Sequence, residues 1–217
     1  MQDHQLKFIE LALARRALRF GQFTLKSGRE SPYFFNAGLF SDGEAIAVLG
    51  RCYAAAITRC ELAFDMLFGP AYKGIALAAS TAAALFDHHG RNVPYAFNRK
   101  EAKSHGEGGN LIGAPLAGRV LVIDDVVTAG TAVRESLDLI RAAGAEPVGC
   151  VFALDRQERG RGELSATEEI EREHGLQCLS VLTLADLIEA LSSPGTSAIS
   201  AEQLAALKAY RQRYGVV

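Results

Sequence analysis

Two adjacent carboxylates, followed by a loop of small and hydroxyl side chains, are the strongest chemical signal in the sequence. The segment reads Val120-Leu121-Val122-Ile123-Asp124-Asp125-Val126-Val127-Thr128-Ala129-Gly130-Thr131. Backbone N–H groups of such a loop, together with the N-terminus of a following helix, bind a phosphate monoester. Asp124 and Asp125 suit the hydroxyl groups of a sugar and can steady magnesium through its waters. The segment therefore predicts a site for a ribose phosphate.

The same segment has a plainer interpretation as a surface turn, because acidic residues are favoured just before a helix by the helix dipole. Its context argues for the site. The β-branched run at 120–123 is typical of a parallel strand covered on both faces. Ligands bind where the carboxyl ends of such strands meet. The glycines at 106, 108 and 109 do not fit the dinucleotide-binding pattern, and the sequence has no P-loop motif.

A second cluster of chemistry lies at 98–109, where Arg99, Lys100, Lys103 and His105 crowd together in an otherwise acidic chain. Cationic donors that reach a leaving pyrophosphate lower the barrier to its departure. The surrounding polar and glycine-rich residues, at 100–110, predict a mobile loop that closes over substrates and opens for release. A solvated charged loop is the alternative.

The elements that must position these residues alternate between strand and helix, which predicts an α/β fold with a parallel sheet. Strands are expected at 64–68, 94–98, 120–123, 148–154 and 177–182. Helices are expected from Leu6 to a C-cap at Gly21, from Ser41 as part of a capping box to about 59, at 74–86, at 131–143, after Ser165 and from about 200. Aromatic residues around 23–35 predict a small β element outside the main core.

Composition bounds the class of protein. The chain has 217 residues, 49% of them hydrophobic and 22% charged, which suits one well-cored domain. A net charge of −2 argues against a nucleic-acid partner. No stretch approaches the roughly 20 apolar residues of a membrane span, and the N-terminus does not read as a signal peptide, so a cytoplasmic location is expected. The spacing of the four cysteines argues against a zinc site or redox pair.

The 120–131 segment resembles the signature of the type I phosphoribosyltransferases, which is four apolar residues, two acids and a Thr-Ala/Gly-Gly-Thr loop. This resemblance implies a Rossmann-like parallel sheet flanked by helices, with a small N-terminal hood containing short β strands. It further implies a single domain over 1–217, with the hood at about 1–40. Members of the family transfer ribose 5-phosphate from 5-phosphoribosyl 1-pyrophosphate (PRPP) to a base.

The segment at 99–108 resembles the catalytic loop of the orotate phosphoribosyltransferases, with the pattern Arg-Lys-Glu-x-Lys-x-His-Gly-Glu-Gly. Further matches occur at 26–28, 31–36, 72–74 and Arg156. The resemblance implies transfer of the ribose 5-phosphate group to orotate, giving orotidine 5′-monophosphate and pyrophosphate in de novo pyrimidine (UMP) biosynthesis. Magnesium is the implied cofactor.

Residue by residue, the resemblance implies three sets of contacts. The PRPP-binding set is Lys26, Tyr72, Lys73, Arg99, Lys100, Lys103, His105, Asp124, Asp125, Val126, Val127, Thr128, Ala129, Gly130, Thr131 and Ala132. The orotate-binding set is Lys26, Phe34, Phe35, Thr128 and Arg156. The catalytic set is Lys100, Lys103, His105 and Asp125, and Lys103 is the main candidate for a contact made only in the transition state. Magnesium is expected to be held mainly by substrate, with water-mediated contacts from Asp124 and Asp125. A homodimer is implied, in which the 100–110 loop reaches the neighbouring subunit's site.

Chemistry supports Arg156 separately, because orotate carries a carboxylate and a guanidinium group matches a carboxylate well. A surface ion pair with Asp155 or Glu158 is the alternative for Arg156. Phe34 and Phe35 could instead pack the hood, and Lys26 and Lys73 could be ordinary solvated lysines. Two other functions stay open, namely transfer to uracil or a purine, and a non-enzymatic sensor that keeps the ribose-phosphate site.

Overall fold

The protein is an α/β structure with one large sheet and one small one. The computed structural model describes residues 1–25, 28–103, 109–127, 130–160, 162–193 and 198–216, with only the backbone at 101–103 and 109. The large sheet has the strand order β5-β4-β3-β6-β7-β8, and the small one is β1-β2. Within the large sheet every neighbouring pair is parallel except β4 and β5. The expected fold class is confirmed.

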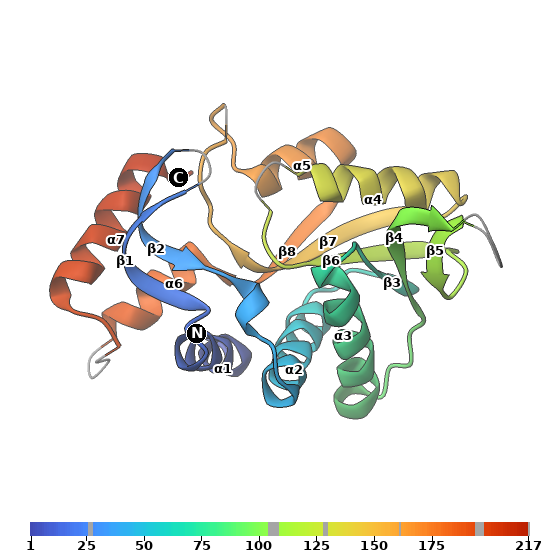
Figure 1. Cartoon of the computed structure of the whole chain (residues 1–217), viewed down its shortest axis with the longest axis horizontal. Helices are drawn as coiled ribbons and strands as arrows, with labels where there is room; N and C mark the ends of the chain where they lie inside the picture. Colours follow the sequence, from blue (N-terminus) through green and yellow to red (C-terminus); the bar gives the residue numbers. More distant parts are fainter. Residues whose placement is uncertain (26–27, 104–108, 128–129, 161, 194–197, 217) are drawn as a thin grey trace.

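Helices cover both faces of the large sheet (Figure 1). Its strands are β3 (Met66–Gly69), β4 (Tyr95–Lys103), β5 (Gly109–Gly113), β6 (Arg119–Asp124), β7 (Glu146–Asp155) and β8 (Gln177–Thr183). On one face lie α1 (Asp3–Ala14), α2 (Gly43–Arg59) and α3 (Lys73–His89), and on the other α4 (Thr131–Ala142) and α5 (Ala166–His174). No described helix combines the length and the apolar character that crossing a bilayer requires.

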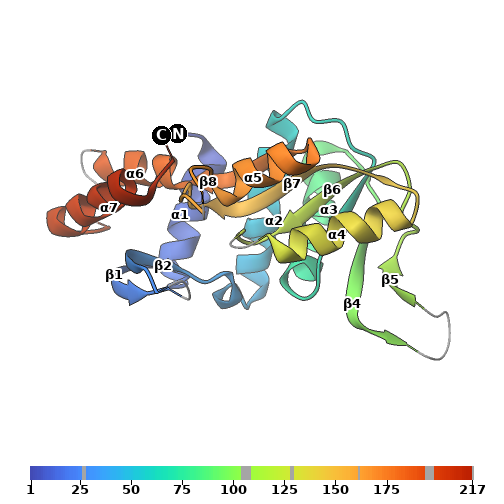
Figure 2. The ribbon, with the colours of Figure 1, turned by 90° about the horizontal axis from the view of Figure 1, so that it is seen from above.

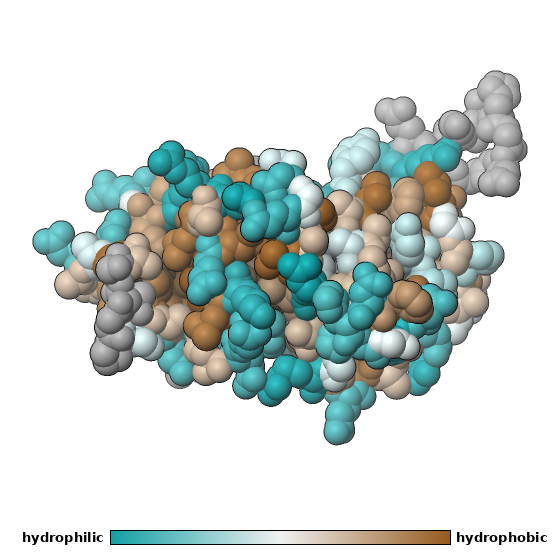
Figure 3. Space-filling model, turned by 90° about the horizontal axis from the view of Figure 1, so that it is seen from below, coloured by the Kyte–Doolittle hydropathy of each residue, from teal (hydrophilic) through white to brown (hydrophobic). Residues whose placement is uncertain are grey.

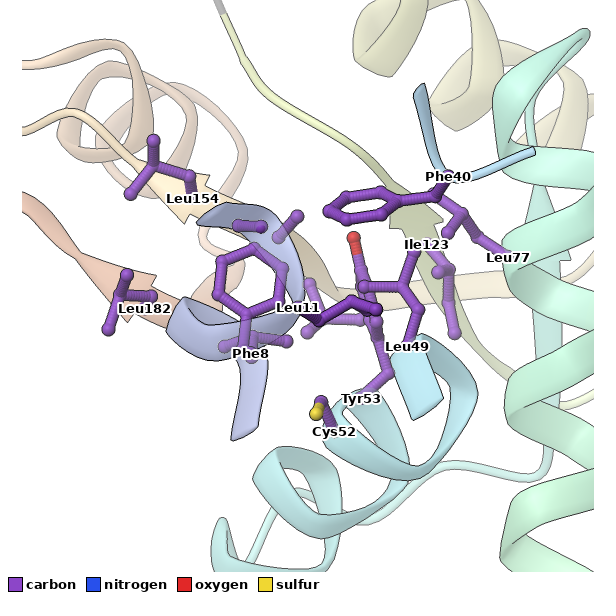
Figure 4. Close-up of a cluster of buried hydrophobic side chains, with 14 of the residues drawn as sticks. Phe8, Leu11, Phe40, Leu49, Cys52, Tyr53, Leu77, Ile123, Leu154 and Leu182 are labelled. Atoms are coloured by element: carbon purple, nitrogen blue, oxygen red, sulfur yellow. The ribbon is translucent and has the colours of Figure 1, made fainter. Parts of the chain in front are cut away.

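The apolar side chains of β6 pack against the helix layers on both faces of the large sheet. Its side chains alternate in direction, so Leu121 and Ile123 join the core beneath α1–α3, while Val120 and Val122 join the core beneath α4 and α5. All four are fully buried. Figure 4 shows side chains of α1 and α2 gathered around Ile123. The prediction of a strand covered on both faces is therefore confirmed.

The outer face of α1–α3 is mainly polar. Figure 3 shows this face, where brown apolar residues are scattered among teal ones rather than joined in one area. Leu6 of α1 and Phe86 of α3 are among the exposed apolar side chains. Isolated residues of this kind are normal on a protein surface.

The small sheet stands at one end of the molecule and the β4–β5 hairpin at the other (Figures 1 and 2). Strands β1 (Leu18–Thr24) and β2 (Glu30–Phe35) are antiparallel, and a 3₁₀ turn (Ala37–Leu39) follows them. Helix α6 (Leu184–Ser192) and the C-terminal helix α7 (Ala201–Tyr214) complete this end. The rings of Tyr33 in β2 and Tyr210 in α7 meet edge to face with centroids 6.0 Å apart. The C-terminal helix thus supports the N-terminal strands.

Two expected helix boundaries are wrong. Helix α1 ends at Ala14, and Gly21 lies inside β1, where its φ of 156° accompanies an irregular register between Phe20 and Phe23. Helix α2 is capped by Asp42 instead of by Ser41, because the Asp42 side chain accepts a 2.8 Å hydrogen bond from the backbone of Ala45.

Two elements were not expected. The polar segment at 100–110 is not a loop throughout, because β4 continues to Lys103 and β5 begins at Gly109. Residues 104–108 lie outside the described part. Helix α6 begins directly after β8 at a capping box formed by Thr183 and Asp186. A strand that runs into an apolar helix offers no polar break to mark the boundary.

Candidate active site

The predicted site residues that follow β3, β6 and β7 lie along one edge of the large sheet. Strands β3, β6 and β7 run parallel, so their carboxyl ends at Gly69, Asp124 and Asp155 meet at the same edge. The Nζ atom of Lys73, the first residue of α3 after the turn that follows β3, lies 2.6 Å from Oδ2 of Asp125, just after β6. The residues expected on the pyrophosphate side and on the ribose side are therefore neighbours.

The main chain of the two acids is fixed by hydrogen bonds. The buried hydroxyl of Tyr53 donates to the carbonyl oxygen of Asp124 at 2.8 Å, and the carbonyl oxygen of Asp125 accepts from Ala153 at 2.8 Å. The Asp124 carboxylate accepts from the backbone of Asp125 at 2.9 Å. Burial, and next the charge of Asp125, raises the pKa of Asp124 to about 7. Near neutral pH Asp124 can thus donate or accept a hydrogen bond.

The start of α4 has the form expected of a phosphate-binding turn. Its N-cap is Gly130, whose φ is 69°, and no side chain caps the helix. The first-turn N–H groups at 131–133 make no hydrogen bond with the described residues. Thr131 and Ala132 are exposed there, while the side chains of Val126 and Val127 pack against the two cores. Thr128 and Ala129 lie outside the described part.

The turn between β3 and α3 is pressed against β6. A Cβ atom on Gly69 would collide with the carbonyl oxygen of Gly74, and one on Gly74 would lie 2.8 Å from the carbonyl oxygen of Ile123. The backbone N–H of Ala71 donates to Oδ1 of Asn98 in β4 at 2.8 Å. These close approaches fix the turn that carries Tyr72 and Lys73.

Strand β4 carries its basic residues past the end of β3. Pairing between the two strands stops at Gly69 and Phe97, so Arg99 and Lys100 lie beyond the sheet edge. The Nζ atom of Lys100 is 5.2 Å from the ring centroid of Tyr72, which is 68% exposed. This places cations beside the Lys73 turn. The side chain of Lys103, with all of His105 and Lys26, lies outside the described part.

Arg156 follows β7 and is largely buried. Its Nη2 and Nε atoms lie 2.6 Å and 2.8 Å from Oε1 of Glu158, and its guanidinium carbon is 4.3 Å from the ring centroid of Tyr33. The ion pair with Glu158 that the sequence left open is therefore present. Asp155 is engaged elsewhere, accepting from the backbone of Gln157 and the hydroxyl of Thr167.

Phe34 and Phe35 face opposite sides of β2. The Phe34 ring stacks on Phe23 with centroids 5.5 Å apart, and the Phe35 ring lies 6.0 Å from Phe8 and 6.1 Å from Phe40. The hood-packing alternative thus describes the contacts of both rings.

Three long-range contacts at this edge were not predicted from the sequence. Arg29 reaches Glu158, the hydroxyl of Tyr53 donates to the backbone of Asp124, and the side chain of Asn98 accepts from the backbone of Ala71, next to Tyr72. A period or motif cannot reveal such contacts, because they join distant parts of the chain.

Comparison with known proteins agrees with this geometry. Residues 40–170 match the model of the phosphoribosyl transferase domain. The fold and the site define a phosphoribosyltransferase. Orotate phosphoribosyltransferase from Thioalkalivibrio sulfidiphilus is 62% identical over the full length of both chains. The crystal structure of the Francisella tularensis orotate phosphoribosyltransferase superposes with a TM-score of 0.86 at 41% identity, covering 96% of this chain and 98% of that one.

A Mycobacterium tuberculosis orotate phosphoribosyltransferase, solved in complex with PRPP, has a TM-score of 0.61 at 28% identity, covering 83% of this chain and 98% of that one. The full-length match at 62% identity to an orotate phosphoribosyltransferase shows to which group of phosphoribosyltransferases the chain belongs. The chain belongs to the orotate phosphoribosyltransferase family.

Proposed function

We propose that this orotate phosphoribosyltransferase joins orotate to ribose 5-phosphate at the strand ends around Lys73, Asp124 and Asp125. The reaction consumes PRPP and orotate and gives orotidine 5′-monophosphate and pyrophosphate. This placement rests on the 2.6 Å contact between Nζ of Lys73 and Oδ2 of Asp125. It brings a cation for the pyrophosphate beside the acids that suit the ribose hydroxyls.

The described residues offer each part of PRPP a matching partner. The uncapped first turn of α4 suits the 5-phosphate, together with the loop from Val126 through Thr128 and Ala129 to Gly130. Asp124 and Asp125 accept hydrogen bonds from the ribose hydroxyls. Tyr72, Lys73, Arg99 and Lys100 bind on the pyrophosphate side. Lys26, which lies outside the described part, and Lys103 and His105 from the loop add to this set.

Magnesium fits this site as a companion of the substrate. Among the described residues no group of three or more His, Cys, Asp or Glu side chains is arranged to hold a metal ion. Two adjacent carboxylates remain, and Asp125 already pairs with Lys73. Asp124 and Asp125 would therefore contact the ion through water while PRPP supplies the direct ligands. When bound, the ion neutralises charge on the departing pyrophosphate.

The transfer itself needs no covalent enzyme intermediate. The deprotonated pyrimidine nitrogen attacks the anomeric carbon with inversion, while the bond from that carbon to the pyrophosphate oxygen breaks. Lys73, Arg99 and Lys100 stabilise the negative charge that the leaving oxygen gains. Lys103 makes its contact on loop closure, so Lys103→Ala lowers the turnover rate. An unchanged turnover rate with a weaker substrate affinity would remove this role from Lys103.

The base is held at the other side of the ribose, between Arg156 and β2. Arg156 binds the carboxylate of orotate. Among the described strands β2 pairs with β1 alone, so its second edge leaves backbone donors and acceptors for a pyrimidine. Contacts at Phe34 and Phe35 are accordingly made by backbone, while their rings pack elsewhere. Lys26 and Thr128 complete the orotate set.

A homodimer would place the loop where it can act. The β4–β5 hairpin lies at the far end of the chain from β1 and β2 (Figure 2). Lys100 lies beside Tyr72 of its own chain, so the residues proposed to reach the site of a neighbouring subunit are those further along the loop at 100–110, Lys103 and His105. Tyr95 and Leu111, on β4 and β5, are each 37% exposed. They are apolar groups that a partner would cover.

The test of the proposed function is the loss of orotate absorbance when the protein is mixed with orotate, PRPP and magnesium. We expect magnesium-dependent loss, with Arg156→Ala raising the KM for orotate far more than the KM for PRPP. Pyrophosphate release with uracil or a purine but not with orotate would overturn the choice of base. Binding of PRPP without turnover of any base would favour a sensor.

A further inference from the structure

The carboxylate of Glu158 lies between two guanidinium groups. Oε1 is 2.6 Å from Nη2 of Arg156, and Oε2 is 3.3 Å from Nη1 of Arg29. The hydroxyl of the buried Tyr33 also donates to Oε1, at 3.3 Å. The side chains of Arg156 and Glu158 are each 13% exposed and that of Arg29 is 24% exposed, so water screens these charges only in part.

These contacts fix the orientation of Arg156 but do not use all of the hydrogen-bond donors of its guanidinium group. Nε and Nη2 both point at Glu158, Nη2 also reaches Oγ of Ser31 at 3.4 Å, and one face of the guanidinium lies on Tyr33. Nη1 has no hydrogen-bond partner among the described residues and is not a buried unpaired atom. Arg156 therefore presents a free donor edge in one defined orientation.

The charges of Arg156, Glu158 and Arg29 together explain the role of Arg29. Arg156 and Glu158 alone would form a neutral pair, and an incoming carboxylate would meet the charge of Glu158 as well as that of Arg156. With Arg29 on the second oxygen of Glu158, the three groups carry one net positive charge. One substrate carboxylate then neutralises the cluster.

We propose that Glu158 and Arg29 are positioning residues that determine specificity for a carboxylate-bearing base. Glu158 orients Arg156, and Arg29 offsets the charge of Glu158, so that Arg156 keeps its attraction for the substrate. This inference rests on the proposed function, in which Arg156 binds the carboxylate of orotate. Neither residue need touch the substrate.

The C-terminal helix supports the same cluster, next to β2 at one end of the molecule (Figure 1). The guanidinium carbon of Arg29 lies 4.6 Å from the ring centroid of Tyr214, and the backbone N–H of Arg159 donates to the carbonyl oxygen of Tyr214 at 2.8 Å. The end of α7 thereby holds both the Arg29 side chain and the segment after Glu158. Recognition of the base is therefore expected to depend on the last turn of α7.

The first test compares Arg29→Gln with Arg213→Gln by initial rates. Arg213 shares the ring of Tyr214, at 5.1 Å, but forms no ion pair with any described residue, so it controls for lost stacking. We expect Arg29→Gln to raise the KM for orotate about fivefold, the scale of one partly screened charge. The KM for PRPP should stay unchanged, and Arg213→Gln should resemble the unmodified protein.

The second test is a rescue. Glu158→Gln keeps the shape of the side chain and an oxygen that accepts from Arg156 while it removes the charge. Combined with Arg29→Gln, it should return the KM for orotate toward its original value, because the uncompensated carboxylate is gone. A purely structural role would make the double variant worse than either single one, and that result would overturn the inference.

Two further outcomes distinguish a failure of this inference from a failure of the proposed function on which it rests. If Arg156→Ala raises the KM for orotate while Arg29→Gln does not, the carboxylate contact stands and the role of Arg29 is wrong. If Arg156→Ala leaves that KM unchanged, the proposed contact itself fails and the inference fails with it. Equal increases in both KM values for Arg29→Gln would indicate general loss of structure and would also overturn the inference.

Discussion

The side chain of Asn98 in β4 accepts a 2.8 Å hydrogen bond from the backbone N–H of Ala71, in the turn after β3. This contact joins two parts of the site that are 27 residues apart in sequence. The strand that carries Arg99 and Lys100 is thereby tied to the turn that carries Lys73. Binding of pyrophosphate by one part should depend on the position of the other.

Asn98→Ala removes that tie. We expect a several-fold increase in the KM for PRPP and a loss of about 1 kcal/mol in the free energy of unfolding, since one partly buried hydrogen bond is broken. Steady-state rates and urea denaturation measure the two effects. Asn92→Ala, at an exposed position before β4, is the matched control. A variant at 98 that loses stability but keeps its KM for PRPP would refute the link.

The pKa of Asp124 predicts a pH dependence of stability. Because this pKa is about 7 in the folded protein against 3.8 when unperturbed, the folded state binds the proton more tightly. The free energy of unfolding should therefore fall as the pH rises from about 4 to about 7. Asp124→Asn removes this loss, so the variant should match the parent near pH 4 and exceed it at pH 8, by roughly 4 kcal/mol at most.

Asp65 provides a control of opposite sign for that experiment. The hydrogen bonds from Arg119 hold the pKa of Asp65 below its usual range, so its contribution is present at neutral pH and fades as the pH falls through the acid range. Urea denaturation from pH 8 down to about pH 2 measures Asp124→Asn and Asp65→Asn, because the contribution of Asp65 changes only below about pH 4. A stability difference between Asp124→Asn and the parent that does not vary with pH would contradict the account.

Gly130 and Gly144 flank α4 and share a left-handed backbone, with φ values of 69° and 79°. Alanine at either position should cost about 1 kcal/mol in stability, because its Cβ strains that conformation. Only Gly130 lies in the proposed phosphate turn. We expect Gly130→Ala to raise the KM for PRPP and Gly144→Ala to leave it unchanged, as initial rates would show. If the two variants have equal KM values for PRPP, Gly130 has no role in phosphate binding.

The parts of the structure that follow from local patterning could be predicted from the sequence. The buried strand at 120–123, the acids at its end and the helix after Gly130 are one continuous segment, so period and turn chemistry suffice. Helix α5 likewise begins at the expected Ser165 and Glu168 capping box.

The rest depends on contacts that no short window contains. Arg29 and Glu158 meet across 129 residues, and Tyr53 reaches Asp124 across 71. Gly21 could be read as the end of a helix because glycine serves equally well in an irregular strand. The sequence offers the ion pair between Arg156 and Glu158 only as an alternative, since sequence proximity does not show which side chains are buried together.

The most direct test of the central claim is PRPP binding by calorimetry in the presence of magnesium. Asp124→Asn/Asp125→Asn should weaken binding at least about 100-fold, because the hydrogen bonds of two carboxyl groups to the ribose hydroxyls are replaced by weaker amide ones. Asp65→Asn, a carboxylate remote from this edge, should bind like the parent. If the double variant binds PRPP as tightly as the parent does, the ribose-phosphate group is held elsewhere and the account of this site is wrong.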